Sequence, residues 1–160
     1  MTSRRRATSG RQIRRALARI PSERGAAAVE FAVVAPLLIL LVFAIIDFGF
    51  GFHAWDGAQN AAREGARVGA VSANVSEITA RVRGATTFLD QTKLDVSVRC
   101  ARAGSGTFST CGAGSTWQEG DIVRVTVVYR YSYITPMPTM VGLGDTLSAT
   151  AIAEARFEGQ

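Results

Sequence analysis

The charge of this 160-residue chain is concentrated in its first 24 residues, which carry eight arginines against a single glutamate, a net charge of +7. The other 136 residues carry ten basic and twelve acidic side chains, a net charge of −2. Because the body of the protein is not basic, the composition gives no support for a nucleic-acid-binding protein. The length allows one domain with appendages.

The N-terminal part predicts a basic cytoplasmic leader over 1–25 and a transmembrane helix over 26–47. The leader has no apolar face that could pack. In the 21 residues 26–46, Glu30 is the only ionisable side chain. A helix of that length spans about 31 Å, close to the ~30 Å hydrocarbon core of a bilayer. Arginines before the segment and only Asp47 after it satisfy the positive-inside rule, so the C-terminal part is expected outside the cytoplasm.

A buried core helix is the alternative for this segment, but the remaining chain is too short to enclose so apolar a helix. Pro36 removes one backbone hydrogen bond and clashes one turn back, so we expect a kink over Ala32–Pro36. Glu30 is costly inside a membrane and should have a partner. Either it reaches the headgroup level and meets arginines there, or it pairs with the α-amine that cleavage between Gly25 and Ala26 would create, on its own or a neighbouring helix.

Residues 48–71 are rich in alanine and glycine and predict that the helix continues beyond the membrane. Small side chains recur at every fourth position and form two adjacent rows, Ala54, Ala58, Ala62, Ala66 and Ala70 beside Gly57, Ala61, Gly65 and Gly69. Such low rows let another backbone approach closely. Two interpretations are equally supported: a contact surface for another helix or subunit, and a helix that lies on the sheet of its own domain.

The remainder, 72–160, predicts an extracytoplasmic α+β domain. Residues 75–89 have apolar side chains at helical spacing, with Asn74 or Ser76 as the N-cap. Prolines and glycines between 136 and 144 mark a connection.

Apolar and polar residues alternate over roughly 93–100, 121–133 and 146–157, which indicates three strands. The last stretch is rich in alanine and glutamate, so a helix is its alternative. The fold class is therefore a membrane-anchored α+β protein, in which a long N-terminal transmembrane helix precedes a small domain. That domain has one or two helices and a short antiparallel sheet of about three strands.

Cys100 and Cys111 flank ten residues rich in glycine, serine and threonine, with no histidine nearby. Outside the cytoplasm this spacing favours a disulfide over a metal site. Closing so short a loop contributes on the order of 3 kcal/mol. Two free buried thiols are the alternative.

The sequence offers no catalytic constellation. His53 is the only histidine, and beside Trp55 at the predicted membrane exit it fits the aromatic belt of an interface better than a catalytic role. The chain has no phosphate-binding loop, no dinucleotide-binding motif and no carboxylate pair in a suitable context. We therefore expect no enzymatic activity, no cofactor and no metal.

The N-terminal part resembles the TadE-like family of the tight-adherence (Tad/Flp) pilus system. The family's characteristic block matches at Arg24, Gly25, Val29, Glu30, Phe31, Ala32, Pro36, Leu37, Leu38, Asp47, Phe48 and Gly49. The resemblance covers about residues 23–70, and the strand-rich remainder is similar to the family only in architecture.

This resemblance implies a single-pass pseudopilin in a bacterial cytoplasmic membrane, trimmed by a prepilin peptidase between Gly25 and Ala26 and incorporated into, or initiating, a thin adhesive pilus. The implied partners are the membrane, the peptidase, and other pilins, pseudopilins and pilus assembly proteins contacted through the N-terminal helix, with no nucleic acid. Major Flp pilins are shorter and usually have tyrosine after the glutamate, so Phe31 and the size of the distal domain favour a minor component.

Two other interpretations remain open. In the first, the chain is an uncleaved single-pass membrane protein whose extracytoplasmic domain binds a cell-surface or cell-wall partner. In the second and weaker one, it is a secreted protein cut after the apolar run, although no persuasive A-x-A site follows Ile46.

Overall fold

The computed structural model describes residues 22–111 and 117–159. All but the last residues of the predicted leader 1–25 lie outside this part. The chain divides after Val42 into two compact units, which are described separately.

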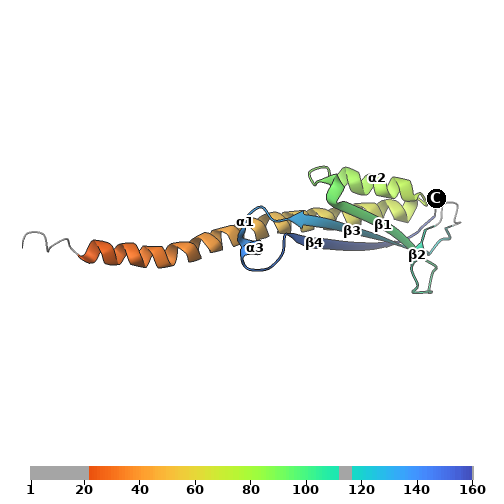
Figure 1. The fold of residues 1–160 in the computed structure, drawn as a ribbon. Helices are drawn as coiled ribbons and strands as arrows, with labels where there is room; N and C mark the ends of the chain where they lie inside the picture. Colours follow the sequence, from red (N-terminus) through yellow and green to blue (C-terminus); the bar gives the residue numbers. More distant parts are fainter. Residues whose placement is uncertain (1–21, 112–116, 160) are drawn as a thin grey trace, which may run out of the picture. The chain divides into compact units, whose positions relative to one another are not determined.

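Helix α1 is uninterrupted from Ser22 to Val71 and enters both units (Figure 1). Pro36 lies inside it without ending it, while the kink expected there stays a prediction. Within the described residues, α1 is the one helix whose length and composition would allow it to cross a membrane. The long N-terminal apolar helix is thereby confirmed.

The second unit contains one antiparallel sheet of four strands in the order β2-β1-β3-β4. The strands are β1 (Leu94–Ala101), β2 (Ser109–Thr110), β3 (Ile122–Ser132) and β4 (Thr146–Arg156). Three of them lie where the alternating residues predict strands. The expected count of about three was one too low, because the two residues of β2 are too few to show an alternation.

Residues 146–157, for which a helix was the alternative, contain the strand β4. It pairs with β3 over eleven residues, from Ile122 opposite Arg156 to Ser132 opposite Thr146. Alanine favours helices in isolation, but here Ala149 and Ala151 are buried on one face of the strand, and Ala151 belongs to the core. Pairing and burial outweigh the local preference.

Helix α2 runs from Val75 to Ala85 and is capped by Asn74, whose Oδ1 accepts hydrogen bonds from the amides of Ser76 and Glu77 at 3.0 and 3.4 Å. The predicted end at residue 89 was wrong. The helix ends at Ala85, and the Oγ1 of its C-cap residue Thr86 donates back to the carbonyl of Val82 at 3.0 Å. Leu89 lies in the turn that follows the helix and is buried there. Its spacing from the apolar residues of α2 therefore did not mean that the helix continues to it.

A short 3₁₀ helix, η2 (Gln91–Lys93), then leads into β1. A four-residue helix, α3 (Met137–Met140), lies in the connection between β3 and β4 and was not predicted. Its Met137 and Pro138 are buried and fix it to the domain.

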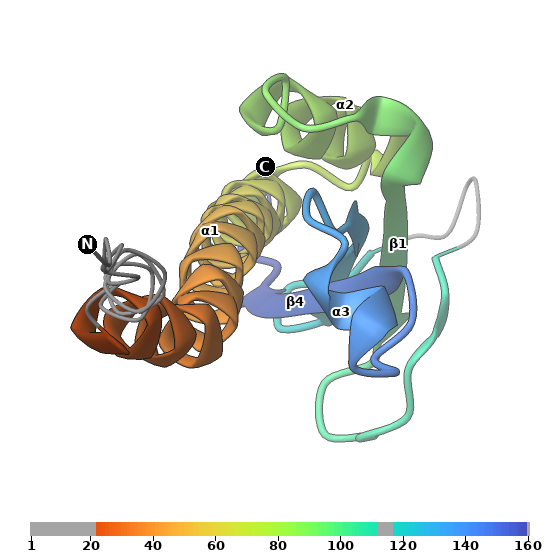
Figure 2. The ribbon, with the colours of Figure 1, turned by 60° about the vertical axis from the view of Figure 1, so that its left-hand side comes forward.

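The core of the second unit lies between one face of the sheet and a layer made by α2 and the C-terminal part of α1 (Figure 2). β3 contributes alternate residues to it, and the fully enclosed side chains include Val123, Val125 and Val127. From α2 the core receives Ile78 and Val82.

Candidate functional site

The predicted processing and pairing residues lie on the N-terminal part of α1. Gly25, Ala26, Glu30 and Pro36 are all exposed there. Ala26 and Glu30 are four residues apart and so share one face of the helix. Glu30 is in none of the ion pairs among the described residues. All the leader arginines except Arg24 lie outside those residues, so both partners of Glu30 stay predictions.

The six predicted helix-packing residues all lie in the core of the second unit. They are Ala54, Ala58, Ala62, Gly65, Ala66 and Gly69. A Cβ atom on Gly65 would come within 2.5 Å of Val82 Cγ2 on α2, and one on Gly69 within 3.0 Å of Val123 Cγ1 on β3. The small residues therefore let α2 and the sheet of the same domain approach α1. Of the two interpretations of this surface, the structure agrees with a helix that lies on the sheet of its own domain. These side chains are therefore not free to contact another subunit.

Asp47 joins α1 to the connection between β3 and β4. Its side chain is only 2% exposed. Oδ1 accepts hydrogen bonds from the backbone amides of Ile134 at 2.9 Å and Thr135 at 3.2 Å, and Oδ2 accepts one from the Thr135 hydroxyl. Sequence reasoning missed this role. A lone carboxylate after an apolar run hints at a special position, but nothing in the sequence connects it with residues 87 positions later.

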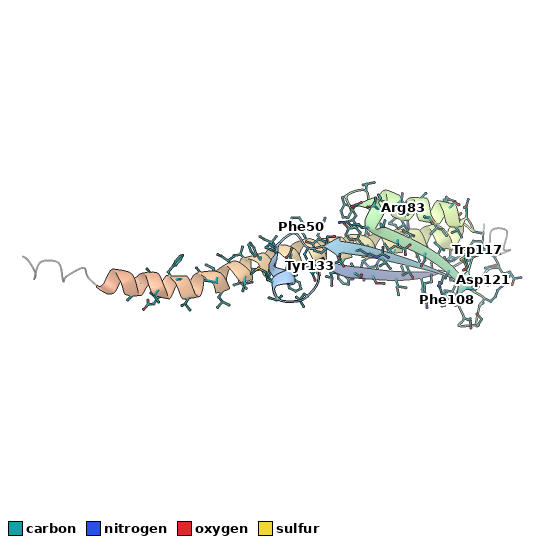
Figure 3. The ribbon with its side chains drawn as sticks, in the orientation of Figure 1. Phe50, Arg83, Phe108, Trp117, Asp121 and Tyr133 are labelled. Carbon is teal, nitrogen blue, oxygen red and sulfur yellow. A yellow bond between two sulfur atoms is a disulfide. The ribbon has the colours of Figure 1, made fainter. Side chains whose placement is uncertain are left out.

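An open apolar groove of about 490 Å³ lies beside this contact. Its lining from α1 includes Phe48, Gly51, Phe52 and Trp55, and its lining from the β3–β4 connection and β4 includes Tyr133, Met137, Pro138, Leu143 and Leu147. Figure 3 labels Phe50 and Tyr133 at this end of the domain, and Trp117 and Asp121 at the opposite end. The apolar surface is therefore at the end of the domain where α1 enters it.

Tyr131 lies in the core near this end, with its ring about 3.7 Å from the place of a Cβ on Gly51. Its hydroxyl is buried and has no hydrogen-bond partner among the described residues. Burial raises the pKa of Tyr131, and the charge of Asp47 adds to the increase. A buried phenol without a partner is a cost to the fold.

The opposite end of the domain is closed by a disulfide between Cys100 and Cys111, with an S–S distance of 2.02 Å. The predicted pairing is confirmed, and the free-thiol alternative is wrong. Asp121 is buried nearby and accepts hydrogen bonds from Arg102 at 2.9 Å and from the amides of Ala103 and Gln118 at 3.3 and 3.0 Å. These contacts hold the ends of the loops that flank β2.

His53 packs against the ring of Phe88, with 5.2 Å between the ring centroids.

Among the described residues there is no group of three or more histidine, cysteine, aspartate or glutamate side chains that could hold a metal ion.

The comparison with protein families finds a match to the family of TadE-like proteins over residues 25–67. No curated protein and no solved structure gives a significant match. The matched segment covers 43 of the 160 residues and lies entirely within α1, with Glu30, Pro36 and Asp47 inside it. The resemblance found in the sequence is thereby confirmed. Residues 25–67 are therefore similar to TadE-like proteins, and the apolar N-terminal helix that contains them fits a single-pass membrane anchor.

Proposed function

We propose that this protein is a minor pseudopilin or membrane-anchored assembly component of a Tad/Flp-type adhesive pilus, with a structural and non-catalytic role. The observation that carries this proposal is the TadE-like match over residues 25–67. In the proposed topology the leader is cytoplasmic, α1 crosses the membrane once, and the α+β domain lies outside.

The exposed side chains of the first unit support an apolar environment for that part of α1. Large apolar residues are exposed at consecutive as well as spaced positions, including Val33, Val34, Leu37 and Leu38. A helix that is apolar all round requires lipid or other apolar helices around it. Because the small-residue surface of the second unit is already covered by its own domain, contacts with other pilus subunits would go through the N-terminal part of α1.

Glu30 is the polar group that would order those contacts. If the peptidase cuts between Gly25 and Ala26, the new α-amine is four residues before Glu30. With a reference pKa near 7.7–8.0 the amine can carry a positive charge. Pairing it with the carboxylate of a neighbouring copy would offset the cost of both groups in an apolar layer and fix the axial position of one helix against the next.

N-terminal sequencing of the protein extracted from membranes of cells that carry the peptidase tests the processing. We expect a chain that begins at Ala26. A chain that begins at Met1 or Thr2 would exclude the processed pseudopilin and leave the uncleaved anchor, whose domain binds a cell-surface or cell-wall partner.

Replacement of Glu30 tests the assembly role separately. We expect Glu30→Ala to enter the membrane as well as the wild type and to abolish its incorporation into pilus assemblies, measured by co-purification with the pilus fraction. Val29→Ala is the matched control, because it shortens the adjacent exposed side chain and keeps the charge. Normal assembly of Glu30→Ala would show that the charge pair is not needed.

A further inference from the structure

We propose that the connection between β3 and β4, residues 133–145, inserts its apolar side chains into the extracytoplasmic surface of the bilayer beside the transmembrane helix. This second lipid contact would fix how the domain stands on the membrane. It rests on the single-pass topology of the proposed function and is independent of the role in a pilus.

The connection exposes a set of large apolar side chains from an ordered backbone. The exposed fractions are 59% for Ile134, 73% for Met140, 53% for Val141 and 63% for Leu143. An apolar surface that the described residues leave uncovered in this way marks an interaction site.

The backbone of this segment suits an apolar environment. The amide of Met140 donates to the carbonyl of Pro136 at 3.2 Å, and that of Val141 to Met137 at 3.1 Å. The amide of Leu143 donates to the carbonyl of Pro138 at 2.8 Å. Because an unsatisfied amide in lipid costs several kcal/mol, these internal bonds are what would allow the tip of the connection to leave water.

The connection is fixed at the level where α1 is expected to leave the membrane. Asp47, the last residue of the predicted transmembrane segment, accepts the amides of Ile134 and Thr135. Next to it on α1, Phe48, Phe50 and Phe52 are exposed by 71%, 54% and 66%. The exposed surface of the connection is thus continuous with an apolar stretch of α1 that begins at the predicted membrane boundary.

The distribution of charge selects lipid as the occupant. The connection and the end of β3 carry no charged side chain from Tyr131 to Gly144, and α1 carries none from Phe48 to Trp55. Trp55 and Tyr133, which both line the groove, are of the residue types that gather at the headgroup level of membranes. An uncharged surface with aromatic residues that adjoins a transmembrane helix fits a bilayer surface better than the water-facing contact of two soluble domains.

Quenching of tryptophan fluorescence by phospholipids with brominated acyl chains tests this placement in the full-length protein. The protein is reconstituted in phosphatidylcholine–phosphatidylglycerol vesicles, in a background with Trp55→Phe and Trp117→Phe. One tryptophan is then introduced at a time, as Met140→Trp or, in a second variant, Leu143→Trp. Both positions are exposed, so neither change should disturb the fold.

Two matched positions complete the design. Ile45→Trp, 64% exposed in the predicted transmembrane segment, is the positive control. Ile152→Trp, 55% exposed on β4, is the negative control, because it lies six residues past Thr146, about 20 Å along the strand from the end of the connection. We expect the fluorescence of Met140→Trp and Leu143→Trp to be quenched nearly as strongly as that of Ile45→Trp. It should be quenched several-fold more strongly than that of Ile152→Trp.

Quenching at positions 140 and 143 no greater than at 152, with position 45 quenched, would overturn the inference and leave the topology intact. Absence of quenching at position 45 would overturn the proposed transmembrane topology, and this inference with it. If Met140→Trp is unquenched and its emission instead changes with the density of protein in the vesicles, the surface is a contact between copies, which also overturns the lipid assignment.

Discussion

The two parts of α1 differ in which side chains they expose and which they bury. In the first unit large apolar residues are exposed, with Phe31 and Leu37 each 70% accessible, whereas in the second unit Ala58 and Ala62 are fully buried. A helix of a water-soluble protein buries its large apolar residues and exposes polar and charged ones. The first unit departs from this rule, which indicates that the N-terminal part of α1 is built to face an apolar medium, whereas the small residues of the C-terminal part let a sheet approach it.

Asp47 lies five residues after the division at Val42 and follows neither pattern. Its carboxylate is buried, but its partners are two backbone amides and a hydroxyl from another part of the domain. A short polar contact at this point attaches the connection between β3 and β4 to the helix. The following changes test the contrast between the two parts, in order of decreasing effect.

Introducing a large side chain should be harmful in the buried part of α1 and harmless outside it. Gly65→Leu would place Cβ 2.5 Å from Val82 Cγ2 and 3.2 Å from Val125 Cγ1. We expect it to lower the free energy of unfolding of the domain by about 3 kcal/mol or more. Denaturant unfolding of the full chain in detergent, followed by tryptophan fluorescence, measures the change.

Gly49→Leu is the matched control, because no atom lies within 4 Å of a Cβ at that position. It should leave the unfolding free energy unchanged or raise it by up to about 1 kcal/mol, since leucine favours helices over glycine. Equal destabilisation by both changes would contradict the division of α1 into an exposed and a covered part.

Removing the carboxylate at the boundary should loosen the connection between β3 and β4. Asp47→Ala leaves the amides of Ile134 and Thr135 without their acceptor, so we expect a loss of about 2 kcal/mol in unfolding free energy and faster hydrogen exchange at these two amides. Asp56→Ala, at an exposed position on the same helix, should change stability by less than about 0.5 kcal/mol. Unchanged exchange at Ile134 and Thr135 in Asp47→Ala would show that Asp47 does not hold the connection.

Tyr131→Phe tests the cost of the buried hydroxyl near the boundary. Because that hydroxyl has no partner among the described residues, its removal should leave stability unchanged or raise it by up to about 1 kcal/mol. A clear loss of stability in thermal unfolding would mean that the hydroxyl is bound in solution.

The smallest effect concerns the water-facing side of the C-terminal part of α1, which carries ion pairs. Arg81 on α2 donates to Glu64 at 2.8 Å. This hydrogen bond, followed by the charge of Arg67, holds the pKa of Glu64 below its usual value. Its contribution to stability is therefore present above the unfolded-state pKa of about 4.3 and is lost as the pH falls through the lower folded-state pKa.

Glu64→Gln should accordingly flatten the acid limb of a plot of stability against pH and change little at neutral pH. Glu154→Gln, which removes the partner of Arg124 on the sheet instead, is the comparison variant. An acid limb that is unchanged by Glu64→Gln would mean that the pair with Arg81 does not persist in solution.

The sequence predicts those features that leave a local pattern. Alternation of apolar residues gives β1, β3 and β4 to within about a residue at most ends, and the Asn74 cap marks the start of α2. Local sequence patterns do not predict features that depend on contacts between distant parts of the chain. The rows of small residues show that something approaches α1 closely, but not whether it is another subunit or the chain's own sheet. The contact of Asp47 with Ile134 and Thr135 joins residues 87 and 88 positions apart and leaves no periodicity to detect.

Collision rates of nitroxide labels in vesicles test most directly whether α1 changes surroundings at Asp47. The native cysteines are joined in the disulfide, so Leu37→Cys and Arg67→Cys each add the one free thiol for labelling. Both positions are exposed in the structure. We predict that the label at 37 collides with oxygen and is shielded from a water-soluble nickel complex, and that the label at 67 shows the reverse. Equal access of the nickel complex to both labels would contradict the account.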